Sequence, residues 1–126
     1  MRKYKENAAL RAKFKKRAEK LEDLSFKAGD FLIRPARSQR ELICEGKTLN
    51  HCVGSYAERM ATGKTAIFFI RRSDAPDIPY FTLEFCEGRV SQCRGYKNDS
   101  YITVPEVEAF VKAWLGYLDK KKGAAA

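Results

Sequence analysis

The side chains best suited to chemistry gather in two short segments of the sequence. Residues 46–56 hold the single histidine of the chain, His51, next to Cys52 and between two glycines. Residues 92–98 read Gln-Cys-Arg-Gly-Tyr-Lys-Asn and follow the most apolar part of the chain. Together these groups suit a phosphate, a base or a nucleotide, with an arginine as the forked donor. We expect the chain to fold back so that four side chains line one pocket: His51, Gln92, Arg94 and Asn98.

A catalytic role for the first segment requires a base close to a nucleophile. Adjacent residues on a helix diverge by roughly 100°, so His51 is poorly placed to activate Cys52 directly. His51 could act instead as a general acid or base with Glu84 or Cys52 nearby. For Cys52, a small buried side chain is the structural alternative. The sequence leaves open whether any reaction is catalysed.

The sequence gives little support for a metal site or a P-loop. Four zinc ligands could come from Cys44, Cys86, Cys93 and either His51 or Cys52, but the short spacing typical of structural zinc is missing. Two Gly-Lys-Thr triplets lack the glycine that a P-loop places five residues before the one preceding lysine, since Glu41 and Glu58 stand there. We therefore expect no cofactor.

Length and composition indicate one domain. The 126 residues are 44% hydrophobic and 12% aromatic, which excludes a disordered class. No apolar run approaches the roughly 20 residues that cross a bilayer, and the charged N-terminus does not resemble a signal peptide. We expect a cytoplasmic protein without a membrane partner, in which the four cysteines are free thiols.

The net charge of +9 is concentrated near the N-terminus. Residues 1–23 carry nine basic and four acidic side chains, a surplus of five positive charges. Such a surface attracts polyanions, although a solvated helix face that maintains solubility is the alternative. We expect DNA or RNA phosphates to meet the following basic residues: Lys13, Lys16, Arg17, Arg34 and Lys97.

Hydrophobic periodicity predicts the helices. Leu10, Phe14, Ala18 and Leu21 form one face of an amphipathic helix over residues 6–24. Ser38 and Glu41 have capping-box spacing and predict a short helix that ends near Gly46. Asn50 would cap a second helix, which stops at Gly63. A third begins at a capping box over 103–106 and buries a stripe of apolar side chains from Val107 to Leu118.

Alternation of apolar and polar side chains predicts the strands. The stretches 65–72, 80–86 and 89–95 form an antiparallel meander, with a short strand at 31–34 that Pro35 ends. If Glu87-Gly88 is a two-residue loop, Gln92 lies opposite Leu83 and Arg94 opposite Phe81. Both polar side chains would then share the face of the phenylalanines, while Cys93 would lie opposite Thr82. Polar side chains on an apolar face need partners, which either a structural salt bridge or a ligand-binding site would supply.

The predicted architecture is a single α+β domain. A three- to four-stranded antiparallel sheet packs against the C-terminal helix and one or two short helices. Residues 1–27 form the basic helical arm, 28–122 the α+β domain and 123–126 an unstructured tail.

Several segments together resemble the PcfJ-like family of conjugative plasmids and related mobile elements. They are residues 49–56, 70–72, 80–84 and 92–98, and the resemblance covers roughly residues 40–118. It implies a nucleic-acid setting and conjugation or other mobile-element proteins as partners, but no reaction and no catalytic residues. The expected function is a nucleic-acid-associated accessory domain; an enzyme using His51, or a protein-interaction module without activity, are the alternatives.

Overall fold

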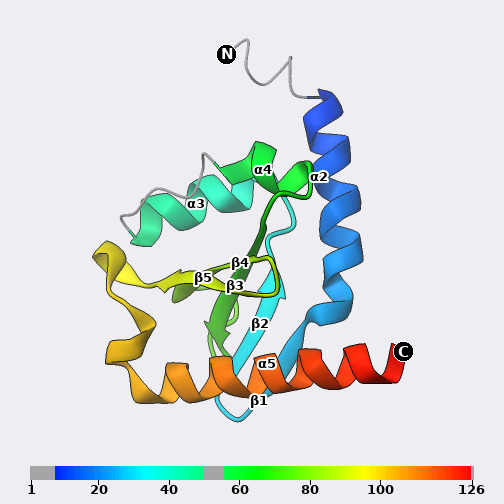
Figure 1. Cartoon of the computed structure of the whole chain (residues 1–126). Coiled ribbons are helices and arrows are strands. Elements are labelled where there is room, and N and C mark those ends of the chain that lie inside the picture. Colours follow the sequence, from blue (N-terminus) through cyan, green and yellow to red (C-terminus); the bar gives the residue numbers. More distant parts are fainter. Residues whose placement is uncertain (1–7, 50–55, 126) are drawn as a thin grey trace.

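A five-stranded antiparallel sheet forms the centre of this computed structural model, which describes residues 8–49 and 56–125 (Figure 1). The strand order β1-β2-β3-β4-β5 is that of a meander. The strands are β1 (Phe26–Ala28), β2 (Phe31–Pro35), β3 (Ala66–Arg72), β4 (Phe81–Cys86) and β5 (Arg89–Arg94). The longer helices are α2 (Ala8–Leu21), α3 (Gln39–Leu49) and α5 (Pro105–Ala125), and α4 (Ala57–Ala61) is short. Single 3-10 turns are η1 (Glu22–Leu24), η3 (Tyr96–Asn98) and η4 (Tyr101–Thr103). The α+β class is confirmed, with five strands rather than three or four.

The additional strand is β1, a segment for which the sequence predicts no strand. It pairs with β2 across a two-residue turn at Gly29-Asp30, and Gly29 takes the left-handed conformation that the turn needs (φ +59°). Three residues are too few to show an alternation, so the pattern gave no signal. Pro35 also belongs to β2, opposite Phe68, instead of stopping the strand before it.

Helix α2 is part of the domain and not an appended arm. Phe14, Ala18 and Leu21 are buried in the main core, as the periodicity predicts. The chain then passes through η1 directly into β1, so the expected boundary at residue 27 falls inside a strand of the sheet. At the other end α5 continues to Ala125, which gives helical backbone to residues 123–125 of the expected unstructured tail.

Helix α3 is longer than predicted. Ser38 Oγ accepts a hydrogen bond from the Glu41 N–H at 3.1 Å and caps the helix as expected. The Glu41 carboxylate accepts from the Arg37 N–H at 2.7 Å, one residue before the bond that a capping box would make. The expected stop at Gly46 is wrong, because Glu45 and Leu49 on either side of it are buried against the sheet. Their contacts outweigh the roughly 1 kcal/mol that glycine costs inside a helix.

Helix α4 ends where the sequence predicts. Gly63 has φ +84° and its N–H donates to the Met60 carbonyl at 3.1 Å, as in a helix C-terminus closed by glycine. The proposed cap at Asn50 lies outside the described residues.

The two faces of the sheet are covered by different helices (Figure 1). On one face Trp114 of α5 packs against Phe68 and Phe85, with ring centroids 4.9 and 5.3 Å away. The Trp114 indole also donates to the Leu24 carbonyl at 2.8 Å, which joins α5 to η1. On the other face α3 contacts polar side chains of β3 and β4. The core therefore has an aromatic layer beneath α5, whereas beneath α3 a buried ion pair lies among apolar side chains such as Leu42 and Phe69.

The predicted register of the last hairpin is correct near the turn and wrong beyond it. Cys86 pairs with Arg89 and Phe85 with Val90, but a β-bulge leaves Ser91 as an extra residue in β5. Beyond it Glu84 pairs with Gln92, Leu83 with Cys93 and Thr82 with Arg94. Gln92 and Arg94 thus lie on the α3 face and not on the face of the phenylalanines, while Cys93 is buried beneath α5.

Among the helices that the structure describes, none combines the length and the apolar character that crossing a membrane requires.

Candidate nucleic-acid interface

A buried ion pair fixes α3 on the sheet. Glu45 accepts two hydrogen bonds from the Arg71 guanidinium, at 2.6 and 3.0 Å, and a third from the Thr82 hydroxyl at 2.8 Å. The exposed fraction is 1% for Glu45 and 4% for Arg71. Both charges are therefore removed from water and satisfied mainly by each other. This geometry makes the pair a structural element and not a ligand site.

A second ion pair lies one helical turn earlier. Arg34 donates to both Glu41 oxygens, at 2.9 and 3.1 Å. Burial alone would raise the pKa of Glu41, but hydrogen bonds from Arg34 and the Arg37 N–H, with the charges of both arginines, lower it overall. The guanidinium groups of Arg34 and Arg71 both lie over the Phe69 ring, 5.3 and 4.6 Å from its centroid. Arg34, expected to contact phosphate, is thus engaged within the fold.

Glu84, the expected partner of a catalytic histidine, is buried and bonded. It accepts a 2.6 Å hydrogen bond from the Thr65 hydroxyl and lies 3.7 Å from the Arg59 guanidinium. Its exposed fraction is 5%. His51 and Cys52 lie outside the described residues. Glu84 therefore joins the turn before β3 to β4 and to α4, which is a structural role.

Three of the four expected pocket residues do meet at one corner of the sheet. Arg94 Nε donates to Gln92 Oε1 at 3.3 Å, and Arg94 Nη1 donates to the Asn98 carbonyl at 3.1 Å. Gln92 in turn donates to the Tyr56 hydroxyl at 3.2 Å. Arg94 is nevertheless exposed, so these bonds orient the guanidinium at the surface without enclosing it. We call Gln92, Arg94 and Asn98 the Arg94 corner; its fourth expected member, His51, is not described.

An aromatic and cationic turn continues from the Arg94 corner. Tyr96 is 55% exposed, and the Lys97 ammonium lies 5.5 Å from its ring centroid. Lys97 and Asn98 both have positive φ angles, 52° and 65°, which turn the chain sharply outward. Tyr96 also lines a hollow of about 430 Å³ together with Leu49 and Tyr80. An exposed aromatic ring beside cations is a surface on which unpaired bases can stack.

The second cationic surface is the outer side of α2. Lys13, Lys16 and Lys20 are exposed at spacings that place them on one side of the helix, opposite its buried stripe. Glu19 is the only acidic residue of the helix. Arg17 is half-buried, and its Nε is shielded from solvent without a hydrogen-bond partner in residues 8–49 and 56–125. The lysines are therefore more available than Arg17 for phosphate contacts.

Helix α3 connects the two surfaces. Its first turn lies beside α2, and Thr48 and Leu49 at its other end line the hollow that contains Tyr96. Arg40 and Lys47 are exposed, and a spacing of seven residues puts them on the same outward side. No ion pair joins either cation to a carboxylate in the described ranges. The sequence did not predict this pair, because the predicted helix ended near Gly46. Once the helix continues past Gly46, the spacing of seven residues places both side chains on one side.

The three cysteines that the structure describes are dispersed. Cys44 is exposed on α3, Cys86 ends β4 and Cys93 is buried, and all three are free thiols. In the part of the chain that is described, no three His, Cys, Asp or Glu side chains group closely enough to hold a metal ion.

Comparison with known proteins places the chain in a family. A family model described as PcfJ-like protein matches residues 1–109, which includes α2 as well as the segments that carry the resemblance. The uncharacterized protein Lin1253/Lin1744 of Listeria innocua serovar 6a is 34% identical over 87 residues, covering 68% of this chain and 19% of that protein. The chain thus spans less than two thirds of the length of this relative. No solved structure matches. Since the family match covers most of the sequence, the chain belongs to the PcfJ-like family.

Proposed function

We propose that this protein binds DNA or RNA as an accessory domain, in the mobile-element setting that its family resemblance implies. The outer side of α2 and the outward side of α3 supply the phosphate contacts, and the Arg94 corner supplies a guanidinium beside an aromatic turn. Conjugation or other mobile-element proteins are the further partners that the resemblance suggests.

The proposal rests on exposed cations of α2 and α3 that have no carboxylate partner in the part of the chain that the structure describes. Lys13, Lys16 and Lys20 on α2 and Arg40 and Lys47 on α3 are exposed and have no carboxylate partner within the described residues. Arg34, Arg37 and Arg71, by contrast, each contact a carboxylate closely. A surface that keeps its cations free is suited to polyanions, because phosphates release their counterions on binding.

The test is salt-dependent binding to labelled single- and double-stranded DNA and RNA. Neutralising two α2 lysines (Lys13→Gln with Lys16→Gln) should weaken binding and reduce the steepness of log K against log[salt] by about 1.4 to 1.8, since each lost phosphate contact removes roughly 0.7 to 0.9. A matched control neutralises two exposed lysines of α5, Lys112→Gln with Lys120→Gln. The control has the same net charge but leaves α2 and α3 unchanged, so it should retain the wild-type slope.

The Arg94 corner is tested by the same measurement. Arg94→Ala should weaken binding, whereas Arg89→Ala, an exposed arginine at the opposite end of the same strand, should not. Equal slopes for wild-type protein and the α2 variant would exclude α2 from the interface. Equal affinities for the two arginine variants would exclude the Arg94 corner.

An interaction module is the second candidate, favoured by exposed apolar side chains. Ile78, Tyr96 and Ile102 are 62%, 55% and 60% exposed. Tyr96 lines the 430 Å³ hollow, and Ile78 and Ile102 adjoin residues that line it, Pro79 and Thr103. Exposed apolar side chains beside a hollow are typical of surfaces that contact other molecules. This candidate predicts no salt-dependent binding to either nucleic acid.

A further inference from the structure

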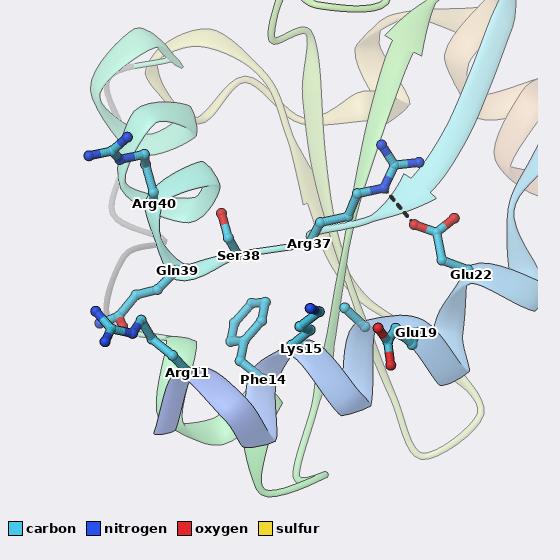
Figure 2. A pocket seen from close by; sticks show the side chains of 10 residues that line it. Arg11, Phe14, Lys15, Glu19, Glu22, Arg37, Ser38, Gln39 and Arg40 are labelled. Carbon is cyan, nitrogen blue, oxygen red and sulfur yellow. Dashed lines mark hydrogen bonds and ion pairs between the residues drawn. The ribbon is translucent and has the colours of Figure 1, made fainter. Parts of the chain in front are cut away.

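Two hollows of similar volume lie beside the cationic surfaces, and they differ in the side chains that they expose. The groove between α2 and the first turn of α3, about 440 Å³, is shown in Figure 2. The ring of Phe14 points into it from α2, but this residue is only 1% exposed, and the Arg37–Glu22 ion pair lies at one end. The groove therefore presents no accessible ring to a ligand. The other hollow, about 430 Å³, does so, because Tyr96 at its wall is 55% exposed.

The hollow beside Tyr96 combines apolar and polar walls. Besides the tyrosine ring, its apolar lining includes Pro79 and Val104, both half-buried. Its volume falls within the range of pockets that hold small organic groups, which are typically apolar with a few polar side chains. The exposed polar residues of its lining are Thr48, Asp99 and Thr103.

The turn that carries Tyr96 is fixed against the sheet. A Cβ atom at Gly95 would come within 3.1 Å of the Phe81 ring and 3.2 Å of the Tyr80 carbonyl oxygen, so the backbone packs directly on β4. The Gly95 N–H donates to the Asp99 carbonyl at 2.8 Å, and the Asp99 N–H donates to the Tyr96 carbonyl at 3.1 Å. The backbone of both lining residues is thus held in place before a ligand binds, which lowers the entropic cost of binding.

Charge distinguishes the inside of the hollow from its outside. The Asp99 carboxylate lines the hollow and has no ion pair within the described residues. Two cations lie in or beside the same turn but do not line the hollow. The Lys97 ammonium lies 5.5 Å from the Tyr96 ring centroid, and the Arg94 guanidinium donates to the Asn98 carbonyl at 3.1 Å. An occupant should therefore place N–H donors inside the hollow and keep its negative charge outside.

We propose that this hollow holds one unpaired base that carries an exocyclic amino group. The base stacks on the Tyr96 ring, and its amino group donates to the Asp99 carboxylate. Its phosphate lies outside the hollow, beside Lys97 and Arg94. Adenine, cytosine and guanine carry such an amino group, whereas thymine and uracil do not. This inference rests on the proposed nucleic-acid binding and refines it, because it assigns a preference for single strands and for certain bases.

Two variants of one side chain distinguish stacking from a general apolar contact. Tyr96→Phe keeps an aromatic ring and should bind a single strand within about twofold of wild type. Tyr96→Leu keeps an apolar side chain without the ring and should weaken single-strand binding about tenfold. Neither should change duplex binding, because a paired base must first leave the stack. Tyr96 lies outside the core cluster, so both variants should retain the fold, which thermal unfolding verifies.

Base identity tests Asp99. Fluorescence anisotropy of the full chain compares labelled strands of about 15 nucleotides made of deoxycytidine or deoxyuridine, which have equal charge and differ in the amino group. Wild-type protein should bind the cytosine strand severalfold tighter, and Asp99→Ala should bring the ratio of the two affinities to about 1. Asp119→Ala, which removes an exposed aspartate of α5, is the matched control and should retain the wild-type ratio.

The outcomes separate this site from phosphate binding in general. Equal affinity of wild-type protein for the cytosine and uracil strands, or equal single-strand affinities of Tyr96→Phe and Tyr96→Leu, would overturn the base site. The salt dependence of binding to the same strands would then still report the phosphate contacts of α2 and α3. Failure of wild-type protein to bind any strand or duplex, even at low salt, would overturn the proposed function together with this inference and favour the interaction module.

Discussion

At the scale of single residues, the pairing of Glu45 with Arg71 should dominate the response of the fold to mutation. Both groups are almost wholly buried, and the Thr82 hydroxyl bonds to the same carboxylate. Removing one partner leaves the other charge buried with nothing to balance it, which is more damaging than losing the pair itself. Glu45→Ala should lower the free energy of unfolding by about 3 to 5 kcal/mol in urea titrations.

The matched control is Glu41→Ala, one turn earlier on the same helix. Glu41 also accepts two bonds from an arginine, but its side chain is 32% exposed, and Arg34 can be solvated once the carboxylate is gone. We expect a loss of about 1 to 2 kcal/mol. If the two variants were equally destabilised, burial would not be what distinguishes the pairs, and the position of α3 on the sheet would need another explanation.

At the scale of elements, the last hairpin shows why side-chain pattern alone could not place the site. The turn at Glu87-Gly88 and the pairs next to it follow from loop length. The extra residue Ser91 does not, because a bulge depends on how both strands meet the rest of the molecule. One inserted residue reverses every following side chain. Gln92 and Arg94 were thus predicted to lie together, correctly, but on the wrong face of the sheet.

Thiol reactivity tests this register. Cys93 pairs with Leu83 beneath α5, and burial raises the pKa of its thiol, so it holds almost no thiolate at neutral pH. Cys44 is exposed on the outward side of α3. Iodoacetamide at pH 8 followed by peptide mass spectrometry should modify Cys44 in the native protein within minutes and Cys93 only after denaturation. Native modification of Cys93 at the rate of Cys44 would place that thiol on an open face, contrary to the bulged pairing.

The helices were more predictable than the sheet for a physical reason. A stripe such as Phe14, Ala18 and Leu21 reports burial within one element, and α2 forms where the stripe predicts it. Gly46 shows the limit of this reasoning, since local propensity favours a stop and the contacts of Glu45 and Leu49 with the rest of the fold decide otherwise. Lys13 and Lys16 were likewise evident from charge, whereas Arg40 and Lys47 required the true length of α3.

At the scale of the whole molecule, the basic N-terminal helix α2 is an integral part of the packed fold. Phe14 and Leu21 belong to the same core cluster as Phe68 and Trp114, and α2 contacts both α4 and β2. Deleting residues 1–23 would therefore remove Phe14, Ala18 and Leu21 from the core and expose the side chains that they cover, as well as removing charge. Burial of a phenylalanine and a leucine alone contributes about 3 to 6 kcal/mol, comparable to the total stability of a domain of this size.

We accordingly expect the truncated chain to lose its cooperative unfolding transition, with near-ultraviolet circular dichroism that is flattened relative to the full chain. The Lys13→Gln/Lys16→Gln variant, which alters only exposed side chains, should unfold within a few degrees of wild type and still bind nucleic acid more weakly. Comparing the truncated chain with the charge variant shows whether α2 is a detachable arm or an integral helix. A truncated protein that remained folded and lost only its affinity would show that α2 is a detachable arm, and its packing against the core in this structure would then contribute little to stability. A truncated protein that unfolds, beside a charge variant that does not, identifies α2 as an integral helix whose outer side is free for a partner.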